Sequence, residues 1–242
     1  PSVSETMIQS MKLGLQISIA LLSFAAVGAF AQSEAVSLFD GKTLKGWKIQ
    51  KGEEKWWRVE AGEIVGGSLD QKIPHNTFIT TEKRYANFEL NLTVKVEGSK
   101  NPNAGIQVRS ERVPEHHEMI GYQADVGPGW WGKLYDESRR RKVIGDYVKP
   151  EVAKSVKQGE WNKYRIICRG KKIQLFINGV MTVDYTEPDG KIPLEGLIGL
   201  QTHGGSAFQV RYKDISIKEL PADEASPKWE DLGEGGKQPW KK

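Results

Sequence analysis

Short stretches of alternating polar and apolar residues, separated by Gly, Pro, Asn and Asp, recur along most of this chain and constrain its fold more than any other feature. In an extended strand such alternation places the apolar side chains on one face, because successive side chains point to opposite sides. The segment KKIQLFINGVMTVDYTE, residues 171–187, predicts a hairpin, since Asn178-Gly179 supplies the positive φ angles of a tight type I′ turn. No convincing amphipathic helix interrupts the pattern. The sequence therefore predicts an all-β fold.

The length of the chain favours one large sandwich domain. Its 242 residues fit a single all-β unit, and the 38% of residues that are hydrophobic suffice for a sizeable core. In a sandwich each strand buries one face and leaves the other to solvent or ligand. We expect this domain to span residues 32–220. Residues 221–242, PADEASPKWEDLGEGGKQPWKK, are polar and rich in Gly and Pro, which predicts a disordered tail.

The segment that begins at Met11, MKLGLQISIALLSFAAVGAFAQ, has the layout of a secretory signal peptide. A lysine precedes an apolar run, and Ala29-Phe30-Ala31 fits a small-x-small cleavage site. We expect residues 1–31 to comprise a signal peptide and an upstream extension, with cleavage near Ala31 and a periplasmic or secreted mature protein. The apolar run is too short for a stable membrane span. An exported chain with only Cys168 folds without a disulfide, and we interpret Cys168 as a buried strand residue.

Charge and histidine spacing limit the partners that this chain is expected to have. Lys and Arg total 35 against 31 Asp and Glu, and the only dense positive run is Arg139 to Arg141, which is typical of a solvated loop. Because a nucleic-acid site needs a clustered basic face, no nucleic-acid partner is expected, and no feature requires a protein partner. His116 and His117 resemble a metal pair, but no spaced third ligand accompanies them. We therefore predict no cofactor, with a divalent metal ion left as an open alternative.

Three predicted strands carry polar residues two positions apart, on the face opposite their apolar residues. These pairs are Gln107 and Arg109 in NAGIQVRS, Gln123 and Asp125 in GYQADVG, and Gln201 and His203 in LIGLQTHGG. If the strands are neighbours, the six side chains line one polar groove. The segment after GYQADVG turns at Gly127-Pro128-Gly129, and we interpret it as a loop that walls this groove.

Several landmarks follow one another in a fixed order between Leu38 and Leu220. They are LFDGKTLKGW, WWRVEAGEIVG, NAGIQVR, GYQADVG, LYDESRRR and GLIGLQTHGG. In this order the sequence resembles the 3-keto-disaccharide hydrolase family. The resemblance implies a two-sheet jelly-roll sandwich of the concanavalin A-like lectin/glucanase type, which binds carbohydrate on its concave sheet. It also implies cleavage of glycosides whose sugar is already oxidised to a ketone at carbon 3. The family often has Glu where Gln123 stands, and Asp125 is the nearest carboxylate that could replace it.

A ketone at carbon 3 changes the chemistry that the site must perform. It acidifies the proton on carbon 2, so that the glycosidic oxygen on carbon 1 leaves by elimination. The site then needs a base, an acid for the leaving group, and a cation at the enolate oxygen. We predict that Asp125 and His203 supply the base and the acid, and that Arg109 stabilises the enolate or holds a pair of sugar hydroxyl groups. An ordinary glycosidase needs two carboxylates across the scissile bond, and the sequence has no Glu-x-Asp-x-Glu run of the kind found in jelly-roll glucanases.

Other residues are candidates for holding the sugar. They are Gln107, Gln123, Gln201, Tyr135, Trp131 and Arg141. Because adjacent residues of a strand point to opposite sides, only one of Trp130 and Trp131 is expected to face the sugar. We thus predict an exported hydrolase or lyase of 3-keto-glycosides. A lectin-like, non-catalytic carbohydrate-binding module and an interaction domain of laminin-G type are the alternatives, and a His and Asp pair in the groove would favour the enzyme.

Overall fold

The computed structural model describes residues 34–221 and 225–237. The predicted signal peptide and upstream extension, residues 1–31, lie outside the described residues. No helix within the described ranges is long and apolar enough to cross a membrane.

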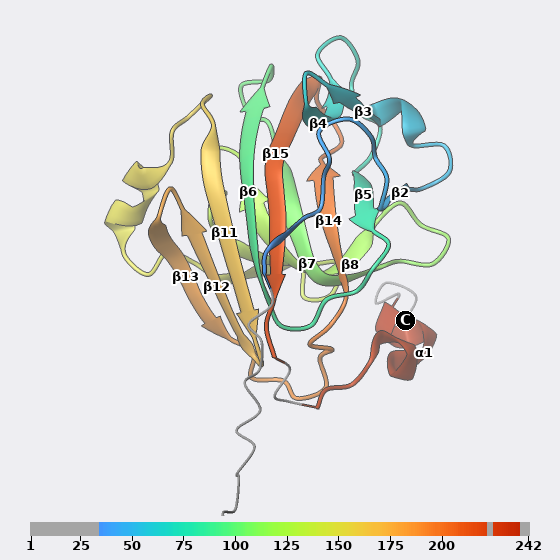
Figure 1. Cartoon of the computed structure of the whole chain (residues 1–242), viewed down its shortest axis with the longest axis vertical. Helices are drawn as coiled ribbons and strands as arrows, with labels where there is room; N and C mark the ends of the chain where they lie inside the picture. The colour runs from blue at the N-terminus through green and yellow to red at the C-terminus, as the bar shows by residue number, and fades with distance from the viewer. Residues whose placement is uncertain (1–33, 222–224, 238–242) are drawn as a thin grey trace, which may run out of the picture. The chain divides into compact units, whose positions relative to one another are not determined.

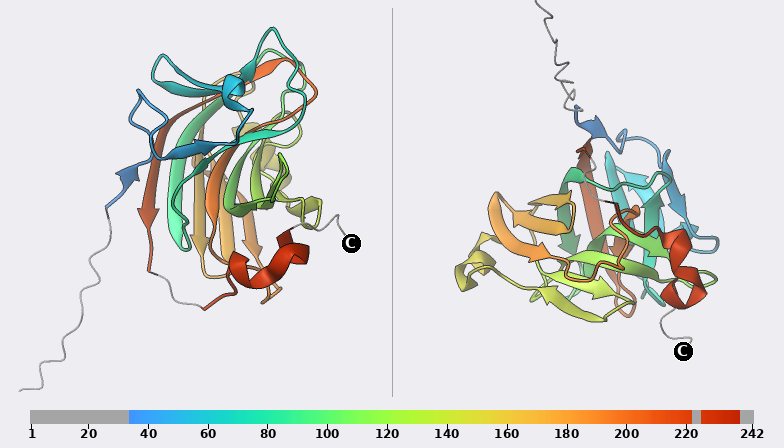
Figure 2. Two further views of the ribbon diagram at one scale, coloured as in Figure 1. Left: turned by 90° about the vertical axis from the view of Figure 1, so that its right-hand side faces the viewer. Right: turned by 90° about the horizontal axis from the view of Figure 1, so that it is seen from below.

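Two antiparallel sheets form the domain and enclose one hydrophobic core between them (Figures 1 and 2). The first, sheet A, has the order β13-β12-β11-β6-β15-β4-β3, with β1 paired to β15. Its strands are β1 (Val36–Ser37), β3 (Trp57–Glu60), β4 (Glu63–Ser68), β6 (Phe88–Glu97), β11 (Asn162–Arg169), β12 (Lys172–Ile177), β13 (Val180–Thr186) and β15 (Phe208–Glu219). The predicted all-β, two-sheet sandwich is confirmed.

The second sheet, sheet B, has the order β10-β9-β8-β7-β14-β5-β2. Its strands are β2 (Trp47–Ile49), β5 (Thr77–Thr81), β7 (Ala104–Arg112), β8 (Met119–Val126), β9 (Leu134–Glu137), β10 (Lys142–Gly145) and β14 (Leu197–Thr202). The three strands that carry the predicted polar pairs are neighbours, because β7 pairs with both β8 and β14. Short helices complete the described residues: η1 (Glu54–Trp56), η2 (Pro150–Ser155), η3 (Trp229–Leu232) and α1 (Gly233–Lys237).

The two sheets differ in how much of their outer faces is exposed to solvent. In β11 buried and more exposed residues alternate, as expected for a strand with one face on the core and one face in water. By contrast, every residue of β8 is buried, although Gln123 and Asp125 point away from the core side chains Tyr122 and Ala124. On the outer face of β8, the polar side chains are therefore held largely out of bulk water.

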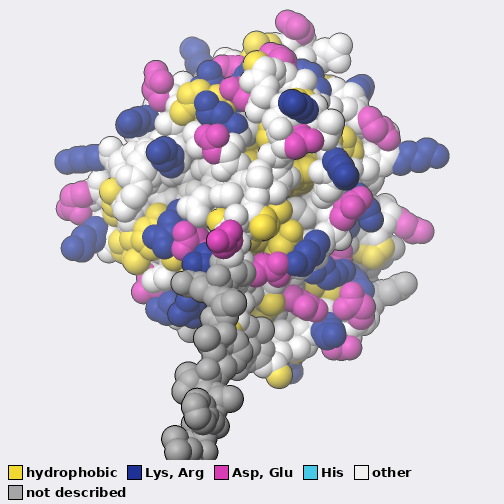
Figure 3. Space-filling model, in the orientation of Figure 1, with side chains coloured by type: hydrophobic (Ala, Val, Ile, Leu, Met, Phe, Trp, Pro, Cys, Tyr) yellow, Lys and Arg dark blue, Asp and Glu magenta, His cyan; other side chains and the backbone are white. Residues whose placement is uncertain are grey.

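Predictions that depend only on neighbouring residues, such as the hairpin turn, agree with the structure. The β12–β13 turn is formed by Asn178 and Gly179, both with positive φ, and Cys168 is a buried free thiol in β11. On the face seen in Figure 3, basic and acidic side chains are interspersed. Arg211, for example, pairs with three carboxylates, those of Glu60, Glu63 and Glu97.

The C-terminal segment is more ordered than its composition predicts. Residues 225–237 include η3 and α1, and the fully buried Trp229 packs against Val113 and Ile120. The indole Nε1 of Trp229 donates to the carbonyl of Glu195, 2.8 Å away. For these residues the predicted disordered tail differs from the structure, because Trp229, with Leu232 packed beside it, supplies an apolar contact with the domain.

Candidate active site

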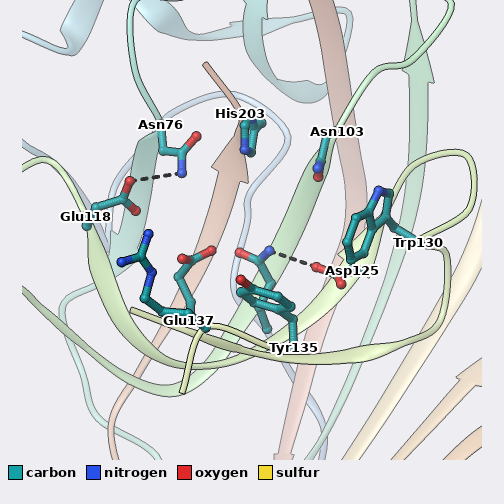
Figure 4. Close-up of a pocket in the computed structure, with 10 residues that line it drawn as sticks. Asn76, Asn103, Glu118, Asp125, Trp130, Tyr135, Glu137 and His203 are labelled. Atoms are coloured by element: carbon teal, nitrogen blue, oxygen red, sulfur yellow. Dashed lines mark hydrogen bonds between the residues drawn. The ribbon is translucent and has the colours of Figure 1, made fainter. Parts of the chain in front are cut away.

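A hollow of about 360 Å³ lies on the outer face of sheet B (Figure 4), and we call it the acid hollow. Its lining residues are Asn76, Asn103, Glu118, Gln123, Asp125, Trp130, Tyr135, Glu137, Arg141 and His203. Of the predicted site residues, the hollow brings together Asp125, His203, Gln123, Tyr135 and Arg141. Its volume is within the range of small-molecule sites.

Strand pairing explains how the floor of the acid hollow is built. Gln123 of β8 lies opposite Tyr135 of β9, and both point away from the core. Asp125 lies opposite Gly105 of β7. A Cβ atom at position 105 would lie 2.4 Å from Cδ of Gln123, so this glycine leaves the space that the glutamine side chain fills. The backbone thus fixes where Gln123 and Asp125 lie.

A chain of buried hydrogen bonds holds the carboxyl group of Asp125. Ser110 Oγ donates to Gln107 Oε1 over 2.7 Å, and Gln107 Nε2 donates to Gln123 Oε1 over 2.7 Å. Gln123 Nε2 then donates to Asp125 Oδ1 over 2.8 Å. The second oxygen, Oδ2, is buried without a hydrogen-bond partner among the described residues. One oxygen of this carboxyl is therefore positioned and the other is available for chemistry.

Burial sets the protonation of this carboxyl. Burial is the largest cause of a pKa of about 8 at Asp125, and the Glu137 carboxyl adds to the rise, while the hydrogen bond from Gln123 and the charge of Lys133 oppose it. A carboxyl with a pKa near neutrality can exchange a proton at working pH.

His203 is oriented by its own backbone. Its Nδ1 lies 2.8 Å from the carbonyl oxygen of Gly204, and a carbonyl oxygen only accepts, so Nδ1 carries the hydrogen. The other ring nitrogen, Nε2, is then the unprotonated acceptor of the neutral ring. The residue is fixed from the backbone as well, since His203 N donates to Asn103 O over 3.0 Å.

Two further carboxyl groups, Glu118 and Glu137, line the acid hollow and were missed in the sequence. Burial raises the pKa of each to about 7, and the positive charge of Arg141 partly offsets the shift in both. Glu118 accepts a hydrogen bond of 3.0 Å from Asn76 Nδ2. Glu137 had a detectable signal, because it stands two positions after Tyr135 in LYDE and so shares its face. Glu118 precedes β8 and carried no such signal.

Arg109 does not face the hollow, so the prediction that it stabilises an enolate or holds sugar hydroxyl groups is wrong. It is fully buried, and its guanidinium donates to Ala86 O, Gly170 O and Asn87 Oδ1 over 2.7, 2.6 and 2.9 Å. Its φ of 50° and the register shift that follows Val108 mark a β-bulge. The bulge breaks the alternation on which the prediction rested, and it turns this side chain away from the polar groove.

Of the two adjacent tryptophans, Trp130 faces the hollow and Trp131 does not. Trp131 is 1% exposed within the core, whereas Trp130 is 40% exposed and meets Tyr135 edge to face, with ring centroids 6.3 Å apart. The choice of Trp131 as the sugar-facing residue is therefore wrong. The expectation that the two rings point to different sides is confirmed, because the turn after β8 sends one ring inward and one outward.

Gln107 and Gln201 lie beneath the lining of the hollow and not on its surface. Both are fully buried. Gln107 holds Gln123, while the amide nitrogen and oxygen of Gln201 have no hydrogen-bond partner among the described residues. Their predicted direct contact with sugar is not supported, and Gln107 instead belongs to the hydrogen-bond chain that positions Asp125.

The described residues contain no group of three or more His, Cys, Asp or Glu side chains arranged to hold a metal ion. The ring of His117 stacks on those of His116 and His75, with centroid distances of 4.2 Å in both pairs. Burial and the two neighbouring rings lower the pKa of His117 to about 4. The predicted pair of histidines is thus part of a packed stack at the edge of the domain.

Solved structures with the same arrangement define the class to which this fold belongs. A candidate glycosyl hydrolase from Parabacteroides distasonis has a TM-score of 0.58 and 24% identity, covering 77% of this chain and 94% of that one. The carbohydrate-binding module CBM66 from Bacillus subtilis has a TM-score of 0.55 and 15% identity, covering 72% and 96%. A galectin-like protein of unknown function from Bacillus subtilis has a TM-score of 0.55 and 9% identity, covering 74% and 91%. These likenesses establish a lectin-like sandwich fold.

The family follows from the sequence itself. The family model described as the 3-keto-alpha-glucoside-1,2-lyase-like domain matches residues 34–218, and the chain belongs to this family. No curated protein matches the chain. The predicted family is confirmed, and membership of it indicates a carbohydrate-active protein.

Proposed function

We propose that this protein is an enzyme that cleaves glycosides of 3-keto sugars by elimination in the acid hollow. One observation carries the proposal: His203 and a buried carboxyl, Asp125, line the same hollow, and the pKa of that carboxyl is about 8. A hollow that only bound sugar would need hydrogen bonds and stacking but no pairing of a histidine with a carboxyl group of raised pKa. The family description supports the substrate class.

In the proposed reaction Asp125 is the base. Its carboxylate removes the proton on carbon 2, and the electron pair of that C–H bond forms the enolate of the carbon 3 ketone. The enolate then collapses to a double bond between carbons 1 and 2 while the bond from carbon 1 to the glycosidic oxygen breaks. His203 gives a proton to the departing oxygen, so the products are an enone sugar and a free alcohol.

The side of the acid hollow opposite Asp125 suits the ketone at carbon 3 of the sugar. Figure 4 shows Asp125 on the same side as Trp130, with Glu118 across the hollow. Arg141 lines the acid hollow and also an adjoining hollow that Glu118 and Glu137 share. Its guanidinium takes the role that Arg109 does not fill, as the cation beside the developing enolate oxygen. Tyr135, on the strand next to β8, donates to a sugar hydroxyl or to that oxygen.

Export is a further part of the proposal. The signal-like segment that begins at Met11 supports action in the periplasm or outside the cell. Detection of the mature N-terminus near Gln32 in the exported fraction would test it.

Kinetic assays with a 3-keto-glucoside and its unoxidised parent test the reaction. The variants are Asp125→Asn and His203→Ala, with Asp184→Asn as the matched control, because Asp184 is an exposed residue paired with Lys172 on sheet A. We expect turnover of the keto sugar only, and a loss of about 10²-fold or more in the two site variants but not in the control.

A substrate deuterated at carbon 2 separates elimination from ordinary hydrolysis. We expect a primary isotope effect on kcat and an enone product that absorbs in the ultraviolet. Cleavage of the parent sugar without an isotope effect would contradict the proposed mechanism. Binding of both sugars without cleavage of either would make the hollow a lectin site and would end the catalytic assignments.

A further inference from the structure

A second hollow, of about 440 Å³, adjoins the acid hollow, and we call it the neutral hollow. Residues 101–103 line it from one loop and residues 203–206 from another, with Pro128 and Trp130 between them. Asn103, Trp130 and His203 line both hollows, so the two hollows meet along these three side chains. A ligand larger than one sugar ring can therefore extend from one hollow into the next.

The two hollows differ sharply in charge. The acid hollow contains Glu118, Asp125, Glu137 and Arg141. The neutral hollow contains no Asp, Glu, Lys or Arg side chain among the residues that line it. Proton abstraction needs the groups of the acid hollow, so the keto sugar belongs there. The neutral hollow offers an aromatic face, amides and backbone, which suit an uncharged ring.

Trp130 is held in place from below. The amide groups of Trp130 and Trp131 both donate to the carbonyl of Gly127, each over 2.9 Å. Trp131 is anchored in the core, and Tyr147 Oη donates to its carbonyl over 2.6 Å. A Cβ atom at Gly127 would lie 2.4 Å from the carbonyl oxygen of Pro102, so the turn also packs tightly on the loop that lines the neutral hollow. An exposed indole on so fixed a turn is a preformed stacking surface.

The junction of the two hollows carries the groups that a glycosidic bond needs. His203, the proposed proton donor to the leaving oxygen, lines both hollows. Asn103 lies at the same junction, and its Oδ1 is a buried acceptor without a hydrogen-bond partner among the described residues. A hydroxyl of the leaving group would satisfy this oxygen.

We propose that the neutral hollow is the subsite for the leaving group and that it accepts an uncharged pyranose or aryl ring stacked on Trp130. This inference rests on the proposed elimination in the acid hollow. It places the second ring of a 3-keto-disaccharide, or the ring of an aryl 3-keto-glucoside, in the neutral hollow, and it disfavours leaving groups that carry a charge or lack a ring.

The test compares three 3-keto-glucosides that share the sugar and differ in the leaving group: methanol, glucose or phenol. Kinetics are measured for the wild type, Trp130→Ala and Trp130→Phe. The matched control is Trp161→Ala, because Trp161 immediately precedes β11 of sheet A, and the ammonium of Lys213 lies 4.1 Å from the centroid of its ring. Binding of unoxidised phenyl glucoside is measured in parallel by calorimetry.

We expect Trp130→Ala to raise KM about tenfold for the glucose and phenol leaving groups and to change it less than threefold for methanol. Trp130→Phe should retain most of the affinity, and Trp161→Ala should match the wild type. An equal effect of Trp130→Ala on all three substrates would overturn the subsite while leaving the elimination intact. If the wild type cleaves none of them, the proposed function fails. In that case, phenyl glucoside binding that is lost in Trp130→Ala would still show that the neutral hollow binds a ring. Binding that is unchanged in Trp130→Ala would rule out this ring site.

Discussion

The buried guanidinium of Arg109 is predicted to stabilise the fold without taking part in catalysis, and a substitution can test this. We expect Arg109→Met to lower the free energy of unfolding by about 3–5 kcal/mol. Three hydrogen bonds from a charged donor contribute roughly 1.5–3 kcal/mol each, and relief of the desolvation cost of the buried charge offsets part of their loss. The methionine retains the apolar stem but leaves the acceptors at Ala86, Asn87 and Gly170 without this donor.

Thermal unfolding followed by circular dichroism measures this effect. For a domain of this size each kcal/mol lowers Tm by about 2–4 °C, so the variant should melt roughly 6–20 °C below the wild type. Arg165→Met is the control, because the Arg165 side chain is 46% exposed and pairs with Glu89 at the surface, where an ion pair contributes at most about 1 kcal/mol. Turnover per folded molecule should stay within about threefold of the wild type, since Arg109 touches no residue of the acid hollow. A variant that melts like the wild type but loses turnover would refute this account.

Three other predictions follow from burial. Because Asp125 must be ionised to act as the base, kcat/KM should rise with pH through about 8, and a flat profile would contradict this role. Burial raises the folded-state pKa of Asp125 above its ordinary value, so between about pH 4 and 8 the folded state holds a proton that the unfolded state has lost. Urea unfolding should therefore show the wild type losing stability relative to Asp125→Asn as pH rises through this window, and parallel curves would contradict the shift. Trp229→Ala should cost about 3–5 kcal/mol and speed hydrogen exchange in the β7–β8 hairpin near Val113 and Ile120; unchanged exchange there would show that the C-terminal segment does not brace the hairpin.

The candidate site was predictable where alternation alone decides which face a side chain occupies. Gln123 and Asp125 alternate with Tyr122 and Ala124, and the structure places the first pair on the outer face and the second in the core. Glu137 follows the same rule from Tyr135. Alternation fails at a bulge, and no local pattern in NAGIQVRS marks the one that turns Arg109 away from the groove.

Alternation and turn residues in the sequence therefore determined the strands and the hairpin at Asn178-Gly179, because each depends on contacts between near neighbours in the chain. The tertiary structure alone decided which polar residues share one hollow. Glu118 lines the same hollow as His203 only because β8 and β14 both pair with β7, and Trp229 is buried only because Val113 and Ile120 leave an apolar surface for it. The raised pKa of Asp125 has the same origin, since burial is a property of the packed sheet and not of the residue.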